Sequence, residues 1–279
     1  MLTRIISSVV GLALLVLIVL SHQIVLGISA FIFSLIGIYE FYAALSKQGH
    51  KPIKPIGYIA CLPVLLVGIF GLSDRVGNFT DVIRVLNYFL MAVYAVIIIL
   101  LAHLVFLNKS YKLVDLAITV FGILYVPFLL SFIVLTRNIE NGLYFIWFIF
   151  IGAWGTDTFA YFSGILFGKR KIIPEISPKK TVEGTIGGIF GCMAITAIYG
   201  AFINNFLNIE VPLYHLAILG ALNGIISQIG DWSASAIKRY AGIKDFGKII
   251  PGHGGVLDRF DSVLLIGPVI YFYFSIFHL

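Results

Sequence analysis

Residues 143–167 read LYFIWFIFIGAWGTDTFAYFSGILF, a stretch of 25 residues in which Asp157 is the only charged side chain. A transmembrane helix needs about 20 consecutive, mostly apolar residues to cross the hydrocarbon core of a bilayer. A strand of a membrane barrel would instead show about ten residues that alternate between apolar and polar. The stretch has the length and the unbroken apolar character of a helix, so it predicts a helix that spans a membrane.

The composition of the whole chain agrees with this prediction. Hydrophobic residues make up 60% of the chain, charged residues make up 11%, and the mean hydropathy is +1.03. A soluble domain carries about 25% charged residues, so this chain has too few to cover a surface that faces water. In lipid only helices and closed barrels satisfy the backbone hydrogen bonds. We therefore expect an all-α, polytopic integral membrane protein.

About nine segments have the length and composition of a membrane span. They lie near 5–21, 24–46, 56–73, 85–107, 113–136, 143–167, 184–206, 213–236 and 259–278. The first of them follows Arg4 as a signal peptide would, but Ile24 opens the next span with no small-residue cleavage site before it, so we expect it to be retained. We divide the chain into residues 1–142, about five helices for scaffold and lipid access, and residues 143–279, about four helices that carry the catalytic site.

The basic residues predict the orientation of these helices. Only Arg75, Arg84 and Arg137 lie in odd-numbered connections, and every other Lys and Arg lies near the N-terminus or in or beside an even-numbered connection. The positive-inside rule then places the N-terminus and the even connections in the cytoplasm. The net charge of +6 is mostly explained by this topology, and we expect no nucleic-acid partner.

Carboxylates inside the predicted spans indicate where the chemistry lies. Asp157, Asp231 and Asp261 fall within or at the ends of apolar segments in the second half of the chain. An acidic group at a helix centre costs about 2.5–3.5 kcal/mol on insertion scales. Ionisable residues at such positions are candidates for a functional site. In the first half, Glu40 lies near the cytoplasmic end of the second span, and we interpret it as a structural residue.

The richest stretch is residues 228–261, QIGDWSASAIKRYAGIKDFGKIIPGHGGVLDRFD. Asp258 and Asp261 are three residues apart, so they share one face of a helix. The connection between the last two spans brings this face near Asp231. Three carboxylates that offer only oxygen ligands suit Mg²⁺ better than Zn²⁺, and we expect these three to bind the metal.

Glycines and cations surround the same carboxylates. The glycines at 252, 254 and 255 allow the backbone to approach a ligand, and they lead into a helix N-terminus that favours a phosphate. The nearby cations are Lys238, Arg239, Lys244, Lys248 and Arg259. Together these groups are typical of phosphoryl or nucleotidyl transfer, where positioning and charge neutralisation do most of the catalysis. The structural alternative is that the basic residues only anchor the topology and the glycines only form a tight turn.

The sixth span and the connection after it form a second polar stretch. Asp157 needs a partner, a metal or a wet cavity, whereas Gly164 and Gly168 have the four-residue spacing of close helix packing. Ser177 and the proline after it predict the cap and first turn of a helix. The residues that follow would grip a triphosphate at this helix end, and they are Lys179, Lys180 and Thr181. The alternative is a solvated basic loop.

The stretch from Ser235 to Asp261 resembles the C-terminal motif of the phosphatidate cytidylyltransferases, also called CDP-diacylglycerol synthases. That family shows Ser, an aliphatic residue and Lys-Arg, then Lys-Asp, His-Gly-Gly, Asp-Arg and a last Asp. The matching positions are Ser235, Ile237, Lys238, Arg239, Lys244, Asp245, Gly247, His253, Gly254, Gly255, Asp258, Arg259 and Asp261. Three further blocks resemble the family, namely 157–161, 177–184 and the pair at 230–231, so the resemblance is strong over about 150–265.

The resemblance implies a Mg²⁺-dependent enzyme that couples CTP with phosphatidate to give CDP-diacylglycerol and pyrophosphate. It implies that Asp231, Asp258 and Asp261 hold the metal and that Lys244 takes part in catalysis. The residues expected to bind substrate are Lys179, Lys180, Thr181, Lys238, Arg239, His253, Gly254, Gly255 and Arg259. We expect the protein in the inner or plasma membrane of a prokaryote, with its site facing the cytoplasm, and a homodimer is compatible with the small-residue helix faces.

Two other classes of function remain open from the residues alone. A CTP-using lipid kinase, or a synthase that acts on ether lipids, would need the same lipid and nucleotide chemistry. A transporter would use intramembrane carboxylates as proton or ion sites. The clustering of charge at one face and the absence of a visible inverted repeat in the sequence favour the enzyme over the transporter.

Overall fold

The protein was described with a computed structural model, and the structure describes residues 2–71, 94, 96–106, 110–207 and 209–277. In these residues every regular element is a helix, and only two isolated β-bridges occur. Six helical segments are long and apolar enough to cross a membrane. They span Gln23–Ser46, Leu113–Asn138, Gly142–Phe167, Val182–Leu207, Leu213–Tyr240 and Leu257–Phe277. The prediction of an all-α polytopic membrane protein is therefore confirmed.

The predicted number of nine spans is not confirmed. Besides the six long segments, three shorter apolar helices occur at Arg4–Leu20, Lys54–Phe70 and Val96–Phe106. They coincide with the three remaining predicted spans, and the predicted span 85–107 lies partly outside the described residues. The predicted span 56–73 corresponds to two short helices, α3 (Lys54–Ile59) and α4 (Leu62–Phe70).

The fifth span is one continuous helix whose hydrogen bonding changes in the middle. It consists of α6 (Leu113–Ile123), the π-helical turn η1 (Leu124–Phe128) and α7 (Leu129–Asn138). Pro127 lies inside η1 and cannot donate the amide hydrogen bond of a regular turn, which accounts for the wider turn at this point.

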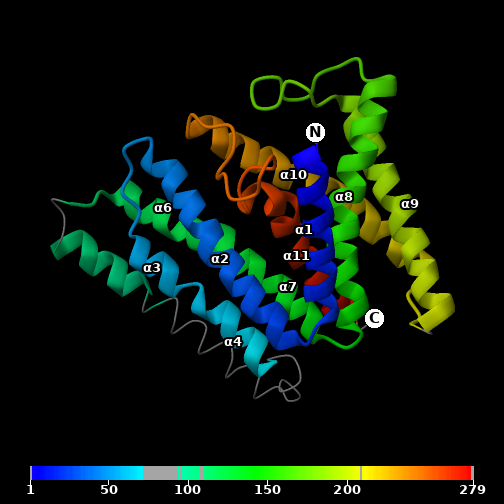
Figure 1. Ribbon diagram of the computed structural model, residues 1–279, viewed down its shortest axis with the longest axis horizontal. Helices are drawn as coiled ribbons and strands as arrows, with labels where there is room; N and C mark the ends of the chain where they lie inside the picture. The colour runs from blue at the N-terminus through cyan, green and yellow to red at the C-terminus, as the bar shows by residue number, and fades with distance from the viewer. Residues whose placement is uncertain (1, 72–93, 95, 107–109, 208, 278–279) are drawn as a thin grey trace.

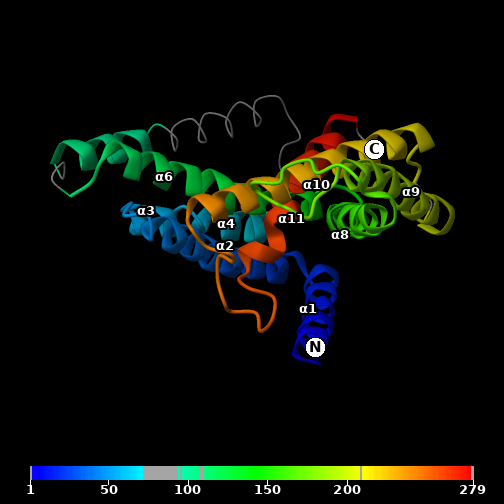
Figure 2. The same ribbon diagram turned by 90° about the horizontal axis from the view of Figure 1, so that it is seen from above.

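The second half of the chain forms a bundle of four helices. α8 (Gly142–Phe167) packs against α9 (Val182–Leu207), α9 packs against α10 (Leu213–Tyr240), and α10 packs against α11 (Leu257–Phe277). In the first half, α2 (Gln23–Ser46) packs against α4 and α7. α1 (Leu2–Leu20) is exposed along most of its length and projects from the bundle (Figure 2).

The connections that the sequence places on one side of the membrane lie at one end of the helices. In Figure 1 the N-terminus and the segments 47–53, 168–181 and 241–256 lie along the upper side. The connections at residues 21–22, 139–141 and 209–212 lie along the lower side, as does the C-terminal end of α11. This arrangement collects most of the basic loops at one end of the bundle.

Small residues let the helices approach each other closely. The predicted packing role of Gly164 is confirmed, because a Cβ there would lie 3.2 Å from Thr181 Oγ1 and 3.7 Å from the Cα of Gly184. On α10, a Cβ on Gly220 would lie 2.6 Å from the Cα of Met193, and one on Gly224 would lie 2.8 Å from the Cα of Ile189. The α9–α10 contact therefore leaves no room for larger side chains at these positions.

We predict that Gly220→Leu destabilises the α9–α10 contact, because the new side chain would meet the backbone of α9. Overpacking of this kind costs about 1–3 kcal/mol, so the melting temperature in detergent should fall by several degrees. The matched control is Gly11→Leu on the exposed α1, where nothing lies within 4 Å of a Cβ. Equal melting temperatures for the two variants would show that α9 and α10 do not pack as described.

Candidate active site

Lys180 joins two carboxylates of different helices at the end of the bundle that carries the basic loops. Its Nζ lies 3.0 Å from Oδ2 of Asp231 on α10 and 3.7 Å from Oδ1 of Asp157 on α8. The three residues were predicted from separate parts of the sequence, and the structure brings them together. Asp157 thus has the partner that a carboxylate in an apolar span requires.

The start of α9 determines the position of Lys180. The prediction that Ser177 caps this helix is wrong, because the helix begins at Val182 and the residues just before it form turns. Thr181 is the cap instead, and its Oγ1 accepts a hydrogen bond of 3.1 Å from the amide of Gly184. Thr181 is buried, and Lys180 directly precedes it. A threonine side chain provides the same capping oxygen as serine, so the sequence offered two candidates one turn apart.

The electrostatic environment keeps Lys180 positively charged. Burial acts to lower the pKa of Lys180, but the carboxylates of Asp231, Asp157 and Asp261 outweigh it and raise the pKa above its usual range. Lys180 is therefore an ammonium at any physiological pH. It supplies a fixed positive charge at the point where α8, α10 and α11 present their carboxylates.

The crossing of α10 and α11 brings Asp231 near Asp261. A Cβ on Gly230, the residue before Asp231, would lie 2.8 Å from the carbonyl oxygen of Asp261 and 3.0 Å from the Cα of Ser262. The Asp261 carboxylate is partly buried, and its Oδ1 accepts a hydrogen bond of 2.8 Å from the amide of Ser262. Glycine at position 230 thus permits the close approach of two helices that each carry a predicted site aspartate.

Asp258 forms a second cluster with Lys238. The Lys238 Nζ lies 2.8 Å from Asp258 Oδ1, and the Asp258 side chain is only 2% exposed. The other oxygen, Oδ2, accepts hydrogen bonds from the amides of Phe246, at 2.8 Å, and Gly255, at 3.0 Å. Lys238 also lies over the ring of Phe246, 5.4 Å from its centroid. Asp258 therefore holds the loop between α10 and α11 against the first turn of α11.

The interpretation of Glu40 as a structural residue is confirmed, although the sequence did not reveal its partners. This buried carboxylate on α2 accepts hydrogen bonds from the amides of Val256, at 3.1 Å, and Leu257, at 2.9 Å. These are amides at the N-terminus of α11, so Glu40 caps α11 from 216 residues away in the chain. A Cβ on either Gly247 or Gly255 would collide with the Glu40 carboxylate. The signal was present as an acidic residue in an apolar span together with these distant glycines, but sequence alone does not pair them.

A cavity lined by basic residues lies next to these clusters. It has a volume of about 530 Å³ and is lined by Arg4, Lys244, Lys248 and Arg259, among others. His253 lies in the same wall, and its two ring nitrogens lie 2.9 Å from Ser7 Oγ and 3.1 Å from Ser8 Oγ on α1. Figures 1 and 2 show the N-terminal end of α1 beside the connection between α10 and α11. The N-terminal helix therefore borders the cavity.

Glycines form the turn that closes one side of this cavity. Gly252 and Gly254 adopt positive φ angles of 78° and 86°, which side chains rarely allow. A Cβ on Gly254 would also lie 2.8 Å from Oδ2 of Asp258. The glycines predicted to shape a pocket thus lie where the backbone must come close to Asp258.

Two predicted substrate-binding residues lie apart from these clusters. Lys179 is exposed in the turn before α9. Arg239 donates hydrogen bonds to the backbone carbonyls of Ile176, at 3.3 Å, and Ile243, at 3.5 Å. Arg239 thus connects the 168–181 connection to the 241–256 connection, and its guanidinium serves to hold the two loops together.

The oxygen donors of the site are the kind that a hard divalent cation prefers. Within the described part of the chain, no three side chains of Asp, Glu, His or Cys lie close enough to one another to hold a metal ion. However, Asp157 and Asp231 share the ammonium of Lys180. This shared ammonium marks a position where the carboxylates attract positive charge. The residues present therefore fit Mg²⁺ in their chemistry.

The fold and the site define a polytopic membrane protein with Lys–Asp pairs and a basic cavity at one end of its helices. The sequence model described as "Cytidylyltransferase family" matches residues 2–277. The chain is 33% identical over 229 residues to "Phosphatidate cytidylyltransferase" of Bacillus subtilis (strain 168), covering 81% of this chain and 82% of that protein.

Two staphylococcal proteins with the same name are similar to the chain over more of its length. The protein of Staphylococcus saprophyticus is 30% identical over 267 residues, and that of Staphylococcus aureus (strain COL) is 32% identical over 267 residues. In both cases the similarity covers 96% of this chain and 96% of the relative. The chain belongs to the cytidylyltransferase family, and it is an enzyme of the nucleotidyltransferase class.

We predict that Glu40→Ala destabilises the loop between α10 and α11, because two buried amides lose their acceptor. Each unsatisfied buried donor costs about 1–3 kcal/mol, so the melting temperature should fall and proteolysis within 241–256 should become faster. Glu140→Ala removes an exposed acid from another connection and is the control. If both variants melt and are cleaved like the wild type, Glu40 does not cap α11.

Proposed function

We propose that the protein transfers the cytidylyl group of CTP to phosphatidate, forming CDP-diacylglycerol and pyrophosphate. The single observation that carries this proposal is the basic cavity beside the N-terminus of α11, bordered by Lys244 and Arg259. A cavity of this size and charge suits a polyphosphate. The names of the relatives support phosphatidate as the second substrate.

The proposed reaction needs little proton transfer. The phosphate of phosphatidate attacks the α-phosphorus of CTP, a new P–O bond forms, and the bond to the β-phosphate breaks with release of pyrophosphate. The attacking phosphate is already an anion at neutral pH, so the site needs no strong general base. It needs cations that neutralise the developing charge and hold both reactants in line.

Each residue has a role that follows from its place in the structure. Lys180 lies at the carboxylate cluster and would neutralise phosphate charge there, as Lys238 would beside Asp258. Lys244 and Arg259 line the cavity and would bind the triphosphate. Lys179, being exposed, would contact only substrate that extends out of the site.

We further propose that Mg²⁺ binds at the aspartates, with Asp231 and Asp261 as its first ligands. Both lie where α10 and α11 cross, and the predicted third ligand, Asp258, already uses both of its oxygens. A bound Mg²⁺ would supply charge to the phosphates and polarise them. Asp258 would then chiefly hold the loop and Lys238 in place.

The site is proposed to face the cytoplasm, where CTP is made. The support is the collection of basic connections at one end of the helices, together with the positive-inside rule. We also propose a homodimer, which the small-residue faces of the helices would allow. A nucleic-acid partner is not part of the proposal, because the positive charge is accounted for by topology and by phosphate binding.

We expect the detergent-purified protein to release pyrophosphate when given CTP, Mg²⁺ and phosphatidate, and mass spectrometry to detect CDP-diacylglycerol. Omission of phosphatidate or chelation of Mg²⁺ should abolish the release. Release of CDP with a polyprenol substrate would identify a lipid kinase instead. The absence of CTP consumption with every lipid tested would rule out the proposed reaction.

Asp258→Asn should reduce turnover by about 100-fold or more, the usual loss when one group that organises a charged transition state is removed. Asparagine preserves the shape of the side chain but leaves the ammonium of Lys238 without its carboxylate, so the variant should insert into the membrane and melt at a lower temperature than the wild type. Glu175→Gln, an exposed change in the 168–181 connection, is the control and should retain full activity. Wild-type turnover in Asp258→Asn would remove Asp258 from the site.

A further inference from the structure

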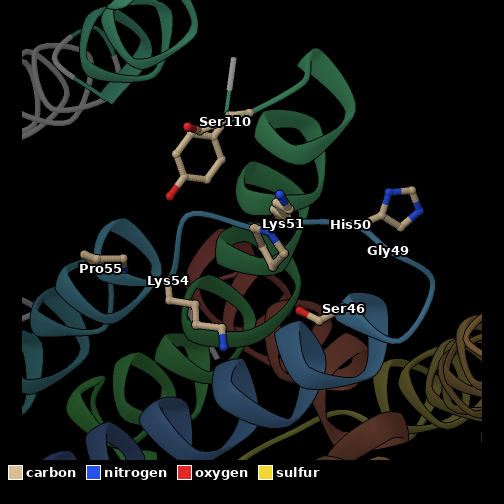
Figure 3. A pocket seen from close by; sticks show the side chains of 9 residues that line it. Ser46, Gly49, His50, Lys51, Lys54, Pro55 and Ser110 are labelled. Atoms are coloured by element: carbon tan, nitrogen blue, oxygen red, sulfur yellow. The ribbon is translucent and has the colours of Figure 1, made fainter. Parts of the chain in front are cut away.

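A second basic hollow lies at the same end of the helices as the candidate active site. It lies between the end of α2, the start of α3 and the turn before α6, and its volume is about 640 Å³ (Figure 3). The polar groups that line it are those of Ser46, His50, Lys51, Lys54, Ser110 and Tyr111. None of them belongs to the motifs that carry the proposed function.

The backbone around this hollow is held in place by Asp115 and Thr119 of α6. Oδ1 of Asp115 accepts a hydrogen bond of 2.6 Å from the amide of Lys51, and Oδ2 accepts one of 2.8 Å from the amide of Lys112. The amide of Ile53 donates to Thr119 Oγ1 at 2.8 Å. Both oxygens of the nearby carboxylate are thus used by backbone amides, and the segment 51–53 is fixed to α6.

The lysines of the hollow are available to an anion. Lys51 and Lys54 are exposed, and in the part of the chain that the structure describes neither ammonium has a carboxylate within ion-pair distance. The hydroxyl groups of Ser110 and Tyr111 stand around the same space, whereas that of Ser46 donates to the carbonyl of Tyr42 at 2.7 Å. Two ammonium groups and two hydroxyl donors are the complement of a phosphate group.

The surroundings favour a phosphate that is attached to a lipid. Leu113 and Val114, in the first turn of α6, are 66% and 51% exposed directly after the polar turn that lines the hollow. The hollow therefore has an apolar surface beside it at the end of two membrane-spanning helices, α2 and the α6–α7 span. Acyl chains could lie along Leu113 and Val114 while the headgroup occupies the hollow, whereas a free phosphate would leave this surface uncovered.

We propose that this hollow binds the phosphate headgroup of an anionic phospholipid of the bilayer, separately from the substrate that the active site turns over. Basic pockets at membrane-facing helix ends are suited to anionic headgroups.

The hollow is connected to the loop of the candidate active site. His50 Nε2 lies 2.9 Å from the hydroxyl of Tyr240, and the two rings stack with centroids 6.1 Å apart. Tyr240 is the last residue of α10, and it directly precedes the loop that Asp258 holds in place. Gly242, with a φ of 65°, lies in the same contact, because a Cβ there would be 3.3 Å from Gln48 Nε2. A lipid in the hollow would therefore lie against the segment that positions this loop.

Photolabelling tests the proposal without depending on catalysis. The full-length protein is placed in phosphatidylcholine nanodiscs that contain a phosphatidylglycerol with a diazirine on its acyl chain, and labelled peptides are identified by mass spectrometry. We expect preferential labelling of the peptide that contains Leu113 and Val114. Lys51→Gln with Lys54→Gln should raise the lipid fraction needed for half-maximal labelling by about tenfold or more. The control, Lys47→Gln with Lys112→Gln, removes two exposed lysines that do not line the hollow and should have little effect.

Several outcomes would overturn the proposal. One is equal labelling of this peptide by diazirine-bearing phosphatidylcholine, and another is unchanged labelling in the Lys51/Lys54 variant. Loss of the label on adding millimolar inorganic phosphate, at constant ionic strength, would identify a site for free phosphate instead of a lipid. Labelling that follows the proposal in a protein that consumes no CTP would leave the lipid site standing and reject only the proposed reaction.

Discussion

The carboxylate of Glu40 fixes the start of α11 and the loop that precedes it. It accepts hydrogen bonds from the amides of Val256 and Leu257 at the start of α11, and it is buried there. An unpaired amide in such a place costs free energy, and a negative charge at a helix N-terminus is favourable. Because α2 supplies this charge, the orientation of α11 depends on a helix from the other half of the chain.

The contacts of the loop between α10 and α11 depend on the cap that Glu40 provides. With the first turn of α11 held by Glu40, Asp258 is directed toward the amides of Phe246 and Gly255, and toward Lys238. The turn can take this path only because Gly247 and Gly255 have no side chain that would meet Glu40. Two acidic groups from distant parts of the sequence thus order one loop. In each case the negative charge is matched by amides or by an ammonium group, as a buried carboxylate requires.

The sequence predicted the class of fold well, because apolar length and composition depend on the membrane and hardly on tertiary contacts. It also drew attention to Asp231, as a carboxylate in an apolar span, and to Lys180 and Asp258, as charged residues in polar stretches beside the spans. The sequence alone does not predict which carboxylate pairs with which lysine. Asp258 pairs with Lys238 and Asp231 with Lys180, and this pairing depends on how α8, α10 and α11 cross.

Two errors, at Ser177 and at the break between α3 and α4, have local causes. Ser177 and Thr181 are both good capping residues, and propensity alone does not decide between them, whereas the contact of Thr181 with Gly164 and Gly184 does. The short helices α3 and α4 were read as one span because the break at residues 60–61 carries no glycine or polar residue. The role of Glu40 depends on a contact across 216 residues, which no local pattern contains.

The carboxylates of Asp231 and Asp258 also explain the positions of Lys180 and Lys238. Lys180 and Lys238 are each paired with a carboxylate, so neither positive charge is left uncompensated among the helices. A substrate phosphate competes for the same ammonium groups, and each carboxylate it displaces needs another cation. In the proposed reaction, a divalent ion held by the aspartates would supply this positive charge when the lysines bind phosphate. The pairing of Lys180 and Lys238 with carboxylates is thus a physical reason to propose that nucleotide and metal bind together, since neither alone would balance the charges.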